Sequence, residues 1–81
     1  MQALVHVTLK KTVLDPQGRA ITAALNNLGH AGVAGVRQGK FFEIELADGV
    51  DPAAARDQVE RIAREVLANP VIEEFTVDLQ P

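Results

Sequence analysis

The sequence contains no cysteine, serine, tryptophan or tyrosine, and it has only three phenylalanines. Without cysteine, disulfide bonds and thiolate metal sites are excluded. Without serine or cysteine, the usual nucleophilic triads cannot be built, and no threonine sits beside a histidine in the sequence. The two histidines, His6 and His30, have no neighbouring ligand pattern. We therefore expect neither catalytic residues nor a metal site in this chain.

An excess of positive charge and long apolar runs are also missing. Eight basic residues stand against 11 acidic ones, which gives a net charge of -3. Nucleic-acid binders usually carry a basic patch, and few aromatic rings are present to stack on bases, so we expect no nucleic-acid partner. No apolar run approaches the ~20 residues that span a membrane, and the N-terminus lacks a signal-peptide layout. We expect no membrane association and a cytoplasmic location.

The 81 residues are enough for one small domain, which we expect to span residues 1–81. A chain of this size buries only about 60% of its unfolded surface, so it is marginally stable alone. Small domains compensate with disulfides, metals or association, and the first two are excluded here. The apolar content of 47% indicates a folded core. Association with other chains is therefore expected.

Apolar periodicity predicts six elements in the order β-α-β-β-α-β. Asp-Pro opens both helices, at Asp15 and Asp51, and Gly29 is placed to end the first one. Gln38-Gly39 is typical of a tight hairpin turn. The predicted elements are strand 2–11, helix 16–28, strand 33–38, strand 40–47, helix 52–68 and strand 71–79.

This order predicts an α+β, ferredoxin-like fold, in which both helices cover one face of a four-stranded antiparallel sheet. The other face of the sheet is left open. Apolar residues among charges make this face a candidate interface, although a solvated face explains the same pattern equally well. The residues expected there are Leu4, His6, Thr8, Lys10, Arg37, Phe41, Glu43, Glu45, Thr76 and Asp78.

The segment V-L-D-P-Q-G, residues 13–18, goes beyond what a helix start requires. Asp15 and Pro16 supply the N-cap and the first helical residue. Nothing in capping requires Gln17-Gly18, and glycine weakens a helix. Further along, Arg37 and Lys40 bracket the predicted turn, where they either bind an anion or simply keep the turn soluble.

Four segments together resemble the PurS family, the small subunit of bacterial and archaeal phosphoribosylformylglycinamidine (FGAM) synthase. V-x-V-x-L-K at Val5–Lys10 precedes V-L-D-P-Q-G, and L-x-x-L-G follows at Leu25–Gly29. V-R-Q-G-K comes next, at Val36–Lys40. The resemblance covers essentially the whole chain in length and element order, with the motifs concentrated before Asp48.

The resemblance implies a non-catalytic subunit that bridges a PurL-type synthetase and a PurQ-type glutaminase and helps to pass ammonia between them. The whole complex consumes ATP, Mg and glutamine to convert formylglycinamide ribonucleotide (FGAR) to FGAM, and this chain binds no cofactor itself. It also implies a homo-oligomer, a dimer or tetramer. Because the needs of the fold alone do not specify Gln17-Gly18 or the pair Arg37 and Lys40, we hypothesise a partner-binding surface at Asp15, Gln17, Gly18, Arg37, Gly39 and Lys40.

Two other readings share the element order. An ACT-like domain that senses small molecules often has glycine after its first helix, as at Gly29 and Gly32 here. An acylphosphatase-like enzyme would need a phosphate-binding loop with arginine after the first strand. Lys10-Lys11-Thr12-Val13 occupies that place, which disfavours the enzyme. Fold alone decides neither question.

Overall fold

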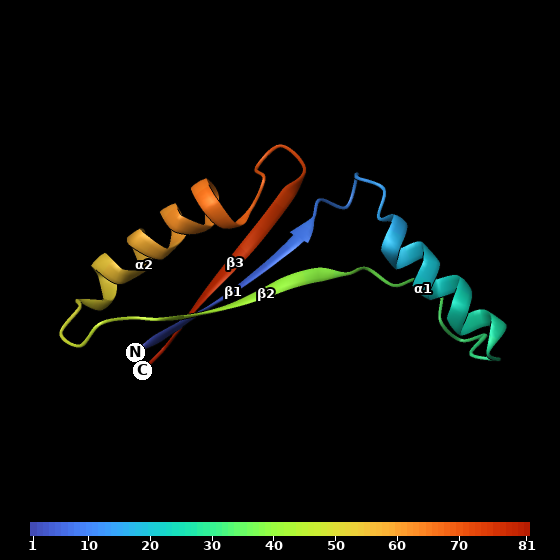
Figure 1. The fold of residues 1–81 in the computed structure, drawn as a ribbon, viewed down its shortest axis with the longest axis horizontal. Helices are drawn as coiled ribbons and strands as arrows, with labels where there is room; N and C mark the ends of the chain where they lie inside the picture. Colours follow the sequence, from blue (N-terminus) through green and yellow to red (C-terminus); the bar gives the residue numbers. More distant parts are fainter.

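A computed structural model describes residues 1–81 and shows an α+β fold with one antiparallel sheet of three strands in the order β2-β1-β3 (Figure 1). The predicted α+β class is confirmed, and most predicted boundaries lie within a few residues of the observed ones. The elements are β1 Gln2–Leu9, α1 Pro16–Asn27, β2 Gly39–Glu45, α2 Pro52–Ile62, the π-helical turn η1 Ala63–Leu67, and β3 Glu73–Gln80.

Strand β1 is the centre of the sheet because its alternating apolar residues can be buried by neighbours on both sides. Ala3, Val5 and Val7 are completely buried. Val5 lies opposite Phe42 of β2 and opposite Val77 of β3. The period-two pattern in the sequence therefore identified both the strand and its buried face.

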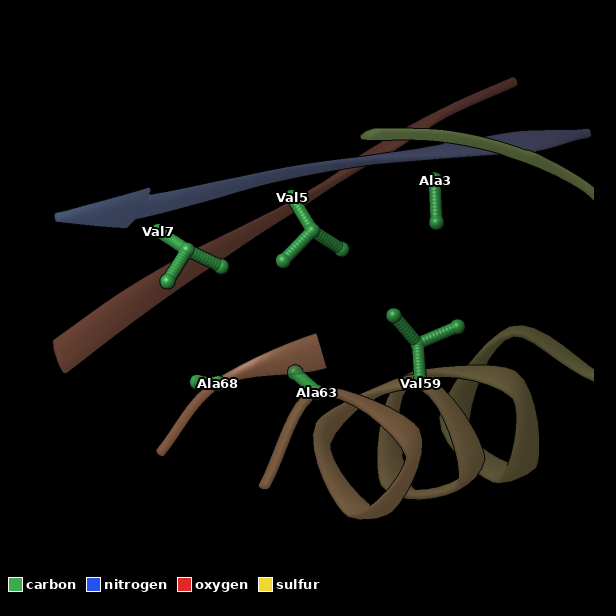
Figure 2. Packing of buried hydrophobic residues seen from close by; sticks show 6 residues of the cluster. All are labelled: Ala3, Val5, Val7, Val59, Ala63 and Ala68. Carbon is green, nitrogen blue, oxygen red and sulfur yellow. The ribbon is translucent and has the colours of Figure 1, made fainter. Parts of the chain in front are cut away.

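Helix α2 and the π-helical turn cover this inner face of the sheet. Val59 and Ala63 are fully buried against the three residues of β1, and Ala68 closes the cluster (Figure 2). Inner-face side chains of β2 and β3 are only partly buried around the cluster. The predicted inward set is confirmed, and it comprises Phe42, Ile44, Leu46, Phe75, Val77 and Leu79.

The second helical segment ends at Leu67, within one residue of the prediction, but its last turn is π-helical and not α-helical. Asp51 caps it as expected, since its Oδ2 accepts the Ala54 amide at 3.1 Å. After Ile62, however, the chain widens into the π-helical turn, where the Ala68 amide bonds to the Ala63 carbonyl at 2.8 Å. This wide turn ends at Leu67, three residues before Pro70, and proline cannot continue a helix.

Helix α1 stands away from the sheet and from α2, and the chain after it runs back along the helix toward β2 (Figure 1). Residues 10–38, called the arm below, make the molecule long: its extents are 51 × 26 × 14 Å, and its radius of gyration is 16.2 Å. A compact chain of this length would have a radius of gyration of about 12 Å. The prediction that both helices cover one sheet face was therefore wrong within this chain.

The predicted fourth strand and hairpin were also wrong. Residues 33–38 form no strand, and the chain continues through Gln38 into β2 without turning. The reason is that this segment is tied to the arm: the Gln38 amide donates to Asp15, and Arg37 donates to the carbonyls of Lys10 and Val13. Arg37 therefore does not lie on the open face of the sheet, where we had expected it.

Neither helix has the length and apolar character needed to cross a membrane.

Candidate partner-binding site

Asp15 joins the two segments that stood out in the sequence. Its carboxylate is only 6% exposed and serves as the N-cap of α1. Oδ1 accepts the Gly18 amide at 3.0 Å, while Oδ2 accepts the Gln38 amide at 2.9 Å. One side chain thus fixes the start of α1 against the start of β2.

These hydrogen bonds change the acidity of Asp15. The bond from the Gln38 amide is the main cause that holds the pKa of Asp15 below its usual value, followed by the bond from Gly18. Removal from water opposes this shift, and the charge of nearby Arg37 supports it. Asp15 is therefore an ionised structural group at neutral pH, and both its oxygens are already engaged.

Gly18 is buried at the point where the returning chain crosses the first turn of α1. A Cβ atom there would overlap the carbonyl oxygen of Val36 and would lie 2.8 Å from Oδ2 of Asp15. The glycine that capping did not require is therefore required by a close backbone approach. The surplus glycine in the sequence pointed to this position, but nothing in the local sequence indicated Val36 as the contact.

Arg37 is exposed, but its guanidinium is bound to the chain's own backbone. Nη2 donates to the carbonyls of Lys10 at 3.0 Å and Val13 at 3.1 Å, with Leu9 at the limit at 3.5 Å. These carbonyls lie at and just beyond the end of β1, and the Lys10 carbonyl also accepts the Val13 amide at 2.8 Å. Arg37 thus fixes the link between β1 and α1.

Gly39 is the first residue of β2 and not part of a turn. A Cβ atom there would lie 2.6 Å from the Val7 carbonyl oxygen and 2.7 Å from Cγ2 of Thr8. Glycine therefore lets β2 approach β1 closely at the base of the arm.

The ends of β1, α1 and β2 enclose an open hollow of about 400 Å³, called the junction hollow below. Four of the six predicted site residues line it: Asp15, Gln17, Gly39 and Lys40. The remaining lining residues are Val7, Leu9, Pro16, Gln38 and Glu73. Of the other two predicted residues, Gly18 is buried behind Asp15, and Arg37 lines a separate shallow depression.

Two polar side chains of the junction hollow are free to meet another molecule. Gln17 is exposed and makes no side-chain hydrogen bond within the chain. Lys40 has a 62% exposed side chain, whose ammonium lies 3.9 Å from the carboxylate of Glu73. The Glu73 side chain is only 14% exposed, but the pair is long and its lysine is exposed, so Lys40 can turn to another acceptor. Sequence reasoning missed Gln38 and Glu73, which become part of the site only through the fold.

The hollow has no hydroxyl or thiol side chain, and no group of three His, Asp or Glu side chains lies close enough to hold a metal ion. Its exposed amide and ammonium groups suit hydrogen bonding to carbonyls or a carboxylate of another protein.

Comparisons with known proteins agree with the motifs. Residues 2–81 match the profile of the family described as "PurS: Phosphoribosylformylglycinamidine (FGAM) synthase". The FGAM synthase subunit PurS of Mycobacterium leprae is 50% identical over 76 residues, which cover 94% of this chain and 91% of that protein. The crystal structure of Methanocaldococcus jannaschii PurS superimposes with a TM-score of 0.87 at 35% identity, covering 98% and 94% of the two chains.

A chain in the structure of PurLQS from Thermotoga maritima is also similar, with a TM-score of 0.85 and 28% identity over 95% of this chain and 93% of that one. The ACT-like alternative gains no support from these matches. Because the family profile and these relatives cover nearly every residue, this chain belongs to the PurS family.

Proposed function

We propose that this chain is the small subunit of FGAM synthase and has no active site of its own. The observation that carries the proposal is the match to PurS proteins along the whole chain, in sequence and in fold. The absence of serine and cysteine supports a non-catalytic role, since the common nucleophiles are missing. Its role is assembly within the complex, in the cytoplasm.

The partners of the proposed subunit are a PurL-type synthetase and a PurQ-type glutaminase. The similarity to a chain of the Thermotoga maritima PurLQS structure supports this choice. In this scheme ATP, Mg and glutamine are used by the partner subunits to convert FGAR to FGAM. The small subunit bridges the partners and helps ammonia to pass between them without loss to water.

Within this scheme the junction hollow is the partner-binding surface. Gln17 and Lys40 make the contacts, because both are exposed and available. Asp15, Gly18, Arg37 and Gly39 act by holding the arm against the sheet in the shape that the partner meets. An engaged carboxylate and a bound guanidinium are better suited to fixing geometry than to binding a partner.

The subunit is also a homo-oligomer, a dimer or tetramer, in which the arm of one copy packs on another copy. Two incompletely covered apolar surfaces, one on α1 and one on the sheet, support this. Helix α1 leaves Ile21 and Leu28 exposed, at 38% and 75%, and contacts neither α2 nor the sheet extensively. The inner face of the sheet leaves Phe42 and Ile44 of β2 only partly covered. A second copy would supply the helix that the predicted fold places there.

Reconstitution tests the function. Purified synthetase and glutaminase are assayed for FGAM formation with glutamine as the nitrogen donor, with and without this chain. We expect turnover to depend on the chain, and the chain alone to show none. Turnover that is unchanged by its omission would refute the proposal.

Charge reversal tests the surface. Lys40→Glu should weaken co-elution with the partners, whereas Arg64→Glu on the exposed side of the π-helical turn should not. Equal co-elution of both variants would remove the junction hollow from the interface.

Light scattering after size exclusion tests the oligomer. We expect Ile21→Asp to shift the mass toward the monomer, while Val66→Asp, at another exposed apolar position (75%), should leave it unchanged. A wild-type protein that already runs as a monomer at high concentration would exclude this part of the proposal.

A further inference from the structure

The sheet face opposite α2 has a charge pattern that the proposed function does not use. Register and alternation place one residue set from each strand on this outer face. The central strand contributes Leu4, His6 and Thr8, and the flanking strands contribute Phe41, Glu43, Glu45, Glu74, Thr76 and Asp78. These nine residues are called the acidic face below.

The acidic face has four carboxylates and no lysine or arginine among its nine residues, and Lys10 follows just beyond its Thr8 end. It therefore holds more negative charge than the whole chain, whose net charge is -3. Leu4 lies directly between Glu43 on one side and Asp78 on the other. None of the four carboxylates takes part in the two ion pairs of the chain, which are Lys40–Glu73 and Arg56–Glu60. Like charges clustered on one face repel one another, so the isolated subunit is destabilised by them.

The centre of the acidic face is apolar and aromatic. The rings of His6 and Phe41 lie with centroids 4.7 Å apart, and Phe41 is 50% exposed. Leu4 is partly exposed beside them. Exposed aromatic residues surrounded by charge are typical of protein interfaces, where the aromatic group enters a pocket and the charges form the rim.

We infer that the acidic face docks a cationic surface of another subunit of the complex, with lysine or arginine around an apolar hollow that receives Phe41. This inference rests on the proposed function and adds a second contact to it. Charge complementarity selects the occupant: a second copy would set four carboxylates against four, which disfavours self-association through this face. The arm would meet its partner on the inner face, on the other side of the sheet, so both contacts can exist at once.

The test combines neutralisation with salt dependence. The double variant Glu43→Gln/Asp78→Asn, Phe41→Ala and the control Asp57→Asn/Glu65→Gln are titrated into purified synthetase and into purified glutaminase by calorimetry, at low and moderate salt. Asp57 and Glu65 are exposed and lie on the α2 and π-helical segments. Circular dichroism and thermal melting confirm that each variant is folded. Neutralising like charges should preserve or raise stability, so weaker binding cannot be attributed to unfolding.

For one of the two partners, we expect the double variant to bind about 10-fold more weakly at low salt and to lose most of the salt dependence of the wild type. Phe41→Ala should weaken binding while keeping the salt dependence. The control should match the wild type. If the double variant binds both partners as tightly as the wild type does, the inference is overturned and the proposed function stands. If the wild type binds neither partner and turnover does not depend on this chain, the inference and the proposed function are both overturned.

Discussion

Replacing Gly18 by alanine is expected to loosen the arm, whereas replacing Gly35 by alanine is expected to leave it intact. The two glycines lie in the same arm but in different surroundings. At Gly18 the added methyl would overlap the carbonyl oxygen of Val36 and crowd Asp15 at 2.8 Å. At Gly35 nothing lies within 4 Å of the added atom, and neither position has a positive φ angle.

The magnitude follows from opposing effects. Overpacking costs about 1 to 3 kcal/mol, and here the obstacle is backbone that cannot rotate away. Alanine returns about 1 kcal/mol through its higher helix propensity. Displacing Val36 also strains the neighbouring bond from the Gln38 amide to Asp15. We expect a net loss of about 1 to 2 kcal/mol, which is a 5- to 30-fold rise in the open fraction of the arm. Gly35→Ala should be neutral or stabilise by up to about 1 kcal/mol.

Native-state hydrogen exchange measured by NMR separates these outcomes, because it reports local opening residue by residue. In Gly18→Ala the amides of Gln38 and Thr22 should exchange faster, while those of Val5 and Val77 in the sheet should not change. Gly35→Ala should resemble the wild type throughout. Equal protection of Gln38 in the two variants would show that the Gly18–Val36 approach does not stabilise the arm.

Three further predictions concern the arm and the core. Arg37→Met should destabilise the arm by about 1 kcal/mol, because the Val13 carbonyl loses its side-chain donor and the Lys10 carbonyl keeps only the Val13 amide, and the amide exchange of that link should rise. Val59→Ala should lower the free energy of unfolding by about 2 kcal/mol at unchanged urea m-value, whereas Val66→Ala, at a position 75% exposed, should change it by less than about 0.5 kcal/mol. Since folding lowers the pKa of Asp15 from 3.8, the stabilising effect of the Asp15 carboxylate is complete above that pH and is lost as the pH falls below it. Far-UV circular dichroism between pH 5 and 2 should show the resulting loss of α1. Asp15→Asn should weaken the arm at pH 7 and remove the part of the pH dependence that is linked to Asp15.

Short-range signals predicted the core well. The faces that pack together were identified by the alternation along β1 and β3 and by the apolar stripe around Val59. Buried residues recur at a known spacing in a strand or a helix, so the sequence pattern shows which face is buried. The sequence also predicted the helix N-caps at Asp15 and Asp51 and the left-handed conformation of Gly29. Such signals depend only on neighbours a few residues away.

Contacts between distant segments were not predictable in the same way. Gln38-Gly39 has the composition of a hairpin, but the Asp15 bond to the Gln38 amide holds the chain straight. Gly18 is explained by Val36, and Gly39 by Val7, neither of which the local sequence indicates. For the same reason, the motifs were enough to choose the six hypothesised site residues. They could not show that Gln17 and Lys40 are free to meet a partner, whereas Asp15 and Arg37 are bound within the chain.

The central position of β1 constrains the order in which the chain folds during synthesis. β1 leaves the ribosome before the other strands, yet one of its two neighbours is β3, and Gln2 lies opposite Gln80. The sheet therefore cannot be completed until β3 has emerged, and pairing over such long sequence separations is slow. The arm differs, because the bonds of Asp15 and Arg37 all join residues within positions 9–38. We expect the arm to form while the rest of the chain is still being translated. A nascent chain would therefore expose helix α1 before its hydrophobic core has formed.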